Sequence, residues 1–135
     1  MSNHFEFTND CIIANGAKHY QIKATEDLPD FSVKEGDLGG YVHETALLGK
    51  GSWVRTDALI GKCVKIGDGV WIGEKAQIDK KAAIGNFTNI GDGAWIGNNA
   101  SNGEKAQIGK RAKIQAYANV VAGERVGDNE EIDSW

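Results

Sequence analysis

An aliphatic residue recurs every six positions over most of the chain, and this period limits the possible folds more than any other feature. The series begins at Val42 and ends at Ile132, with one polar exception at Asn102. A small or β-branched residue usually stands two positions before each member, and glycine is frequent one position after it. Neither an α-helix nor the simple alternation of a plain strand produces this spacing. The period predicts a β-solenoid, in which each short strand pairs with the strand one full turn later.

The aliphatic series and the small residues are predicted to fill the interior, because alternate residues of a strand point to the same side. Glycine is expected after each aliphatic residue if a Cβ would obstruct either the backbone conformation or a close approach there. The residues just before the series then face outward. In the first turn these are apolar, namely Tyr41, Leu47, Trp53 and Leu59, whereas Asn119, Arg125 and Glu131 in the last turn are polar. An apolar outer surface at one end predicts that this end is covered, by the start of the chain and by another subunit.

The segments 66–71 (IGDGVW) and 90–95 (IGDGAW) show the repeat in its clearest form. They resemble the signature of the hexapeptide-repeat family: an aliphatic residue, then Gly, Ala, Glu or Asp, two variable residues, a small residue and one more. The resemblance covers about two thirds of the chain. It implies an all-β fold, a left-handed parallel β-helix with three repeats per turn and, at this length, about five turns.

Residues 1–40 break the period, and we expect them to form a small N-terminal β cap on a β-helix of residues 41–135. Alternating stretches on either side of Asn15-Gly16 predict a β-hairpin with a tight turn. Residues 30–42 resemble the segment that precedes the repeats in a group of uncharacterised bacterial and phage β-helix proteins, a likeness that carries no activity. A cap is expected because an open solenoid end exposes unpaired strand edges and core.

The hexapeptide-repeat family includes acyltransferases, which resemble one another in using a histidine as general base at a subunit interface, with the acyl carrier along the coil. A proton acceptor poised near neutral pH suits that reaction. This chain has three histidines, His4, His19 and His43, and none lies in the coils after the first. His43, beside the predicted cap, is the single catalytic candidate, and a solvated corner histidine is the alternative. No metal site and no cofactor are expected, since the coil lacks histidine clusters and its acidic corners alternate with lysines.

The leading hypothesis from the sequence is therefore a non-enzymatic protein that serves as a structural or partner-binding oligomer, including one encoded by a phage. The first alternative is an acyl-CoA-dependent acyltransferase of the hexapeptide-repeat type. A further alternative is an acidic inhibitor of a host nucleic-acid-binding or defence protein. The net charge of −4 argues against binding of nucleic acid by the chain itself.

A homo-oligomer is expected, and the family resemblance favours a trimer. Trp53 and Trp71 are 18 positions apart and should stack on one face, followed by Asn89, Gln107 and Arg125. The candidate interface residues are Tyr41, Leu47, Trp53, Leu59, Trp71 and Trp95.

Three asparagines close to the break in the series, Asn98, Asn99 and Asn102, form a candidate polar notch. We expect the amide of a buried Asn102 to bond to coil backbone or water, with a local bulge or a ligand-facing notch as the alternatives. Two cysteines give no disulfide framework, and no signal sequence or long apolar run is present. The sequence therefore predicts a cytoplasmic protein that does not enter a membrane.

Overall fold

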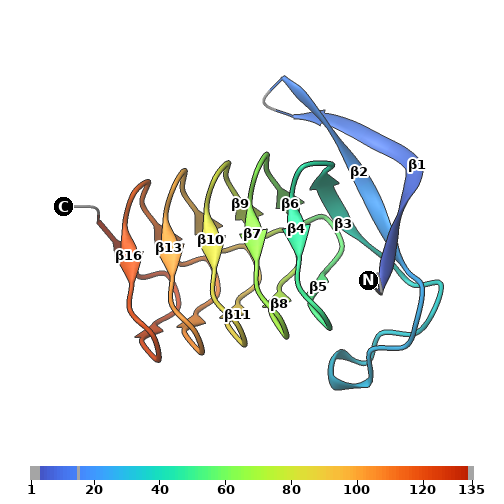
Figure 1. Ribbon diagram of the computed structural model, residues 1–135. Helices are drawn as coiled ribbons and strands as arrows, with labels where there is room; N and C mark the ends of the chain where they lie inside the picture. Colours follow the sequence, from blue (N-terminus) through green and yellow to red (C-terminus); the bar gives the residue numbers. More distant parts are fainter. Residues whose placement is uncertain (1–3, 15, 134–135) are drawn as a thin grey trace.

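The computed structural model describes residues 4–14 and 16–133. Its β-strands stack into three sheets that form the faces of a coil (Figure 1). Sheet I contains, in order, β1 (Phe5–Ala14), β2 (Ala17–Ala24), β3 (Leu38–His43), β6 (Leu59–Ile60), β9 (Gln77–Ile78), β12 (Trp95–Ile96), β15 (Lys113–Ile114) and β18 (Glu131–Ile132). Sheet II contains β4 (Leu47–Leu48), β7 (Lys65–Ile66), β10 (Ala83–Ile84), β13 (Ser101–Asn102) and β16 (Asn119–Val120). Sheet III contains β5 (Trp53–Val54), β8 (Trp71–Ile72), β11 (Asn89–Ile90), β14 (Gln107–Ile108) and β17 (Arg125–Val126).

The coil follows the predicted period, because each of its strands pairs in parallel with the strand 18 residues later. Leu48 lies beside Ile66 in sheet II, and Trp53 lies beside Trp71 in sheet III. The aliphatic series fills the interior, where residues such as Ile72 and Ile96 are fully buried. The prediction of an all-β, left-handed parallel β-helix of about five turns is confirmed. Among the described residues the one helical element is the short 3-10 turn η1 (Pro29–Phe31), and none of them forms a helix able to span a membrane.

The glycines that follow the aliphatic residues are required by close packing between coils. A Cβ placed on Gly103 would lie 2.4 Å from the backbone nitrogen of Ala122 in the next coil. The left-handed backbone conformation instead occurs two residues later in the corner, at Gly51 and also at non-glycine residues such as Lys75 (φ 63°). Of the two reasons the sequence left open for these glycines, close approach is the one that applies.

The N-terminal strands β1 and β2 form an antiparallel hairpin that extends sheet I beyond the first coil (Figure 1). β2 pairs with β3, which places His19 opposite His43. Asn15 of the predicted turn lies outside the described residues. Because β3 begins at Leu38, it crosses the predicted boundary at residue 40, and the division into two domains stays a prediction.

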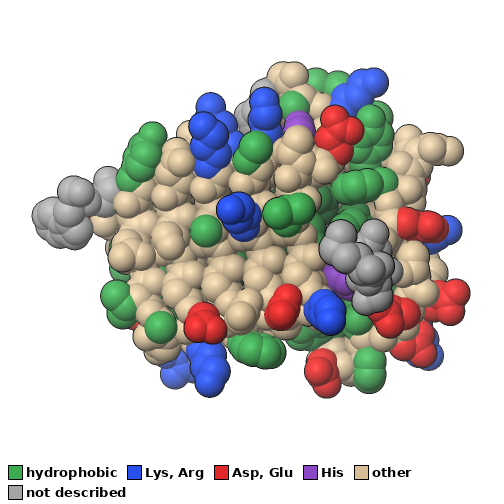
Figure 2. Space-filling model, viewed as in Figure 1, with side chains coloured by type: hydrophobic (Ala, Val, Ile, Leu, Met, Phe, Trp, Pro, Cys, Tyr) green, Lys and Arg blue, Asp and Glu red, His purple; other side chains and the backbone are tan. Residues whose placement is uncertain are grey.

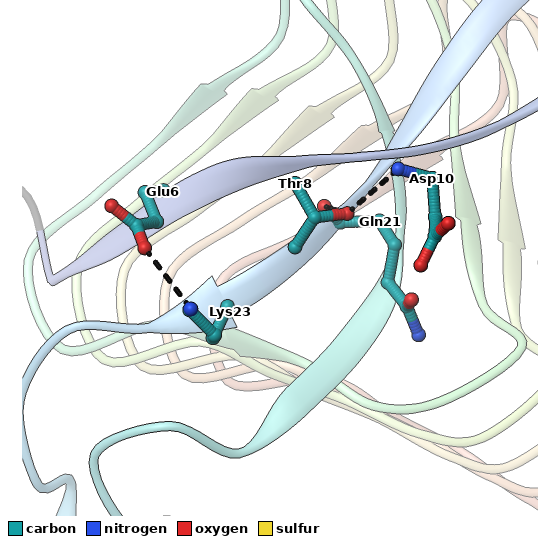
Figure 3. Close-up of polar contacts among 5 residues, drawn as sticks. All are labelled: Glu6, Thr8, Asp10, Gln21 and Lys23. Carbon is teal, nitrogen blue, oxygen red and sulfur yellow. Dashed lines mark hydrogen bonds and ion pairs between the residues drawn. The ribbon is translucent and has the colours of Figure 1, made fainter.

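An irregularity in β1 is stabilised by a side chain of the hairpin itself (Figure 3). The register of β1 against β2 shifts between Phe7 and Cys11. There the hydroxyl of Thr8 donates a hydrogen bond to the carbonyl of Gln21 (3.0 Å) and accepts one from the N–H of Asp10 (3.2 Å). The bulge bends the strand, and the Thr8 hydroxyl supplies hydrogen bonds where the register shifts.

The loop between β2 and β3 covers the apolar start of sheet III. The ring of Phe31 packs on Trp71 with centroids 4.7 Å apart, and Trp53 is buried. His4 donates a hydrogen bond from Nε2 to the carbonyl of Ser52 (2.7 Å), which joins the start of the chain to the coil. The chain's own N-terminal segment therefore shields this part of the first turns.

The polar break in the interior, Asn102, keeps its place in the ladder. It pairs in register with Ile84 on one side and Val120 on the other, so there is no bulge. Its side chain is buried, and neither Oδ1 nor Nδ2 has a hydrogen-bond partner among the groups that the structure describes. The expected bond to coil backbone is therefore not formed.

Candidate functional site

A cavity of about 500 Å³ lies between the tip of the hairpin and the corner that follows sheet I. The hairpin contributes residues on both sides of its turn, and the coil contributes residues of β6, β9 and the corners after them. The side chains with polar chemistry that line it are His19, His43, Lys62, Gln77, Asp79, Lys80 and Asn98. The cavity therefore exists only because the hairpin folds back onto the coil.

Two histidines lie side by side in the lining of this cavity. His19 on β2 and His43 on β3 are opposite one another, with ring centroids 5.5 Å apart and ring planes at 74°. Both side chains are buried. His43 was the catalytic candidate from the sequence, whereas His19 was not singled out. The sequence predicted the hairpin strand that contains His19. It did not show that this strand pairs with β3, which carries His43.

Each histidine is held through its Nδ1 atom. His43 Nδ1 accepts a hydrogen bond from the backbone N–H of Thr45 (3.1 Å) and lies 2.7 Å from the Thr45 hydroxyl oxygen. That hydroxyl in turn accepts the N–H of Cys63 from the next coil (2.9 Å). His19 Nδ1 lies 3.1 Å from the carbonyl oxygen of Ala17. Both rings are thus fixed in orientation by backbone groups.

The environment of His19 favours the neutral ring. Burial lowers its pKa below the usual value of 6.5, and the nearby His43 lowers it further, while the hydrogen bond to Ala17 opposes these effects. The imidazole is therefore uncharged at neutral pH, the state that a general base requires.

A carboxylate at the same cavity is also held in place. Asp79 accepts hydrogen bonds from the amide of Gln77 (2.9 Å) and from the indole N–H of Trp95 (2.8 Å). The lysines that line the cavity, Lys62 and Lys80, come from neighbouring turns of the same corner. The cavity thus combines a neutral base with one fixed negative group and two positive groups.

A second groove, of about 640 Å³, runs along the outside of sheet III below the Phe31 loop. Its floor is the column predicted from the 18-residue spacing, since Trp71, Asn89, Gln107 and Arg125 pair in that order. No histidine lines this groove within the described part of the chain. It offers surface for binding but no neutral base.

The predicted interface residues lie in different environments. Trp53 is buried, Trp71 is partly covered by Phe31, and Trp95 bonds to Asp79. Leu59 lines the histidine cavity, Tyr41 pairs with Gln21 of the hairpin, and Leu47 is 62% exposed.

The three asparagines of the predicted notch are not brought together. Asn98 lines the histidine cavity, Asn99 is at a corner with φ 60°, and Asn102 faces the interior.

The acidic corners have a structural role. Asp92 accepts the backbone N–H of Glu74, and Asp128 accepts that of Lys110, each at 2.9 Å and across one turn of the coil. Across residues 4–14 and 16–133, no group of three or more His, Cys, Asp or Glu side chains is arranged to hold a metal ion.

Acid is expected to destabilise the fold through His19. Because its pKa is lower in the folded chain, the unfolded chain takes up the proton first as the pH falls below 6.5. The contribution of His19 to stability is complete above that pH and is lost as the pH falls through the folded pKa. Thermal unfolding between about pH 7.5 and about pH 5 should show a falling midpoint, with a weaker dependence in His19→Gln. Equal slopes for the two proteins would contradict this account.

Comparison with known proteins adds to this geometry. No protein-family model matches the sequence, and no curated protein matches it significantly. Among solved structures, the acetyltransferase domain of PglB from Neisseria gonorrhoeae is similar, with 26% identity over 70% of this chain and a TM-score of 0.67. That match covers 49% of the PglB domain, so the chain spans about half its length. A variant of perosamine N-acetyltransferase from Caulobacter crescentus, in complex with CoA and GDP-perosamine, matches 79% of the chain and 60% of its own length, with 20% identity and a TM-score of 0.51. At that identity the second likeness shows the fold alone.

The chain has the left-handed β-helix fold, built from six-residue repeats, and shares that fold with these acetyltransferases. The sequence-based hypothesis of a non-enzymatic protein is contradicted by the likeness to the PglB acetyltransferase domain. The reason for that hypothesis was the lack of a histidine in the regular coils. In the structure the hairpin brings a second histidine, His19, beside His43 of the first coil.

Proposed function

We propose that the protein is an acyltransferase that moves an acyl group from an acyl-CoA thioester to an acceptor bound in the histidine cavity. The observation that carries this proposal is the likeness to the PglB acetyltransferase domain at 26% identity and a TM-score of 0.67. The cavity supports it independently, since a buried neutral imidazole beside a 500 Å³ space is what proton transfer from an acceptor needs.

The charged groups suit the two reactants. Lys62 and Lys80 place positive charge at the edge of the cavity, where the phosphates of an acyl-CoA would be attracted. Asp79 is held by Gln77 and Trp95, so its carboxylate is ready to orient a hydroxyl or an amine without first reorganising. The acyl arm would lie along the outer face of sheet I, which runs from the cavity down the coil.

We further propose that the working unit is a homotrimer. Figure 2 shows that the face over β7, β10 and β13 carries mainly uncharged atoms, with a basic side chain within it and other charged side chains near its edges. The outward residues of this sheet are the exposed Leu47, Lys65, the small Ala83 and Ser101, and Asn119, so Lys65 is its one charged outward side chain among the described strands. A cytoplasmic location stays a prediction of the sequence.

The proposed activity predicts saturable binding of acetyl-CoA and release of free CoA when an acceptor is added. Calorimetric titration tests the first, and a thiol assay with a panel of amino sugars and sugar nucleotides tests the second. Lys62→Ala should weaken acetyl-CoA binding severalfold, because a phosphate contact in the cavity is lost.

Gln107→Ala in the groove of sheet III is the matched control, and it should bind acetyl-CoA as the wild-type protein does. If Gln107→Ala loses acetyl-CoA binding while Lys62→Ala keeps it, the binding site is the groove of sheet III and not the histidine cavity. Absence of binding by the wild-type protein would refute the proposed function. Light scattering that shows a monomer at working concentrations would reject the trimer.

A further inference from the structure

The backbone partners of the two histidines fix which nitrogen of each neutral ring carries the proton. A backbone N–H can only donate, so His43 Nδ1, which receives the N–H of Thr45, has no proton of its own. Neutral His43 therefore carries its proton on Nε2. A carbonyl oxygen can only accept, so His19 Nδ1, which faces the carbonyl of Ala17, carries the proton. Neutral His19 therefore has an unprotonated Nε2.

This difference separates the two rings as bases. His43 Nδ1 already faces two donors from Thr45, and protonation there would displace the backbone N–H. His19 Nε2 has no hydrogen-bond partner among the described residues, and His19 lines the cavity. Of the two rings, only that of His19 can accept a proton from a bound molecule without breaking a hydrogen bond that the structure shows. His43 presents an Nε2–H donor at the same cavity.

We propose that His19, on the N-terminal hairpin, is the general base of the acyl transfer, and that His43 is a hydrogen-bond donor beside it. This inference rests on the proposed function and adds the residue that performs the proton transfer. It places the base outside the coil, on the strand that pairs antiparallel with β3. Catalysis then requires the hairpin to be docked.

The chemical step is balanced as follows. The acceptor amine or hydroxyl attacks the thioester carbonyl of acyl-CoA while His19 Nε2 takes its proton, and a C–N or C–O bond forms. The Nε2–H of His43 can donate to the carbonyl oxygen as it becomes negative. The tetrahedral intermediate then collapses, the C–S bond breaks, and the protonated His19 returns the proton to the sulfur. The products are the acylated acceptor and free CoA, and His19 is neutral again.

The first test does not depend on activity. Nitrogen-15 NMR of the histidine rings in the full chain, at pH 7.5, reads the tautomers directly. We expect neutral His19 with the proton on Nδ1 and neutral His43 with the proton on Nε2, each assigned by the loss of its signals in His19→Gln and His43→Gln. The opposite tautomers would overturn the inference, whatever the enzymatic result.

The second test uses acetyl-CoA with glucosamine and with hydroxylamine, an amine small enough to enter the cavity. His19→Ala should lose about 10²- to 10⁴-fold in kcat, and added imidazole should restore part of that loss. His43→Gln should keep an acidic limb in the pH profile, moved to higher pH because His43 no longer lowers the pKa of His19. Gln107→Ala, in the groove of sheet III and outside the cavity, should keep the wild-type rate. Circular dichroism confirms that each variant is folded.

The outcomes separate the two proposals. If the wild-type protein transfers acetyl groups and His19→Ala does so equally well, the base is elsewhere and this inference fails while the proposed function stands. If the expected tautomers are found but the wild-type protein transfers nothing to either acceptor, the proposed function fails and the catalytic role of His19 fails with it.

Discussion

Replacement of Gly103 by alanine is expected to lower the free energy of unfolding by about 3 kcal/mol. The added Cβ would lie 2.4 Å from the nitrogen and 2.7 Å from the Cα of Ala122, atoms of the next coil's backbone. Backbone in a solenoid cannot move aside as a flexible side chain can, because the N–H of Gly103 is bonded to the carbonyl of Val120 at 2.7 Å. The coils must separate locally, and interior contacts in both are weakened. Chemical denaturation measures the loss.

Gly51→Ala is the matched control for this variant. Gly51 has a φ of 68°, and nothing lies within 4 Å of a Cβ built there. The substitution therefore adds only the cost of a left-handed residue, about 1 kcal/mol. If Gly51→Ala destabilised the protein as much as Gly103→Ala, backbone conformation and not coil spacing would explain the glycines of the repeat.

Asn102→Ile is expected to raise the free energy of unfolding by about 1–3 kcal/mol, the cost of a buried polar group without a partner. Both polar atoms of Asn102 lack partners in the described chain, and the residue pairs with the aliphatic Ile84 and Val120. Isoleucine fits the position, since it is the commonest residue of the series and adds apolar contact in the interior. The shift in the denaturation midpoint gives the gain.

Thr88→Val tests whether polarity alone is responsible. Thr88 is also a buried polar residue of the coil, but its hydroxyl donates to the carbonyl of Gly103 at 3.0 Å. Its replacement should lower stability by about 1 kcal/mol. A decrease in stability for Asn102→Ile, or a loss of acetyl-CoA binding, would mean that the amide has a bound partner and a functional role.

The fold was predictable from the sequence because the repeat is local and redundant. Every turn restates the same arrangement of aliphatic residue, corner and small residue, so an exception such as Asn102 does not obscure the pattern. The column from Trp71 to Arg125 was predicted from the 18-residue turn, and the strand pairing confirms it. Handedness came from the family resemblance and not from the spacing.

The candidate site was not predictable in the same way. His43 was recognised as a candidate, but His19 lies in the part of the chain that has no repeat, and its partner strand is set by the docking of a hairpin. The hydrogen bonds to Thr45 and Ala17 that distinguish the two rings depend on the detailed geometry of the corner and the hairpin turn. A pattern of residue types does not show which backbone group lies beside each histidine ring.

The sequence by itself determined the solenoid, its interior and the columns on its faces, because a six-residue period specifies which side chains share a position in successive turns. Only the tertiary structure decided where the non-repeating first forty residues lie, that glycine is needed for coil spacing, and that two histidines meet in one cavity. The physical reason is that contacts within the repeat are fixed by spacing along the chain, whereas the cap contacts the coil through long-range pairing of β2 with β3.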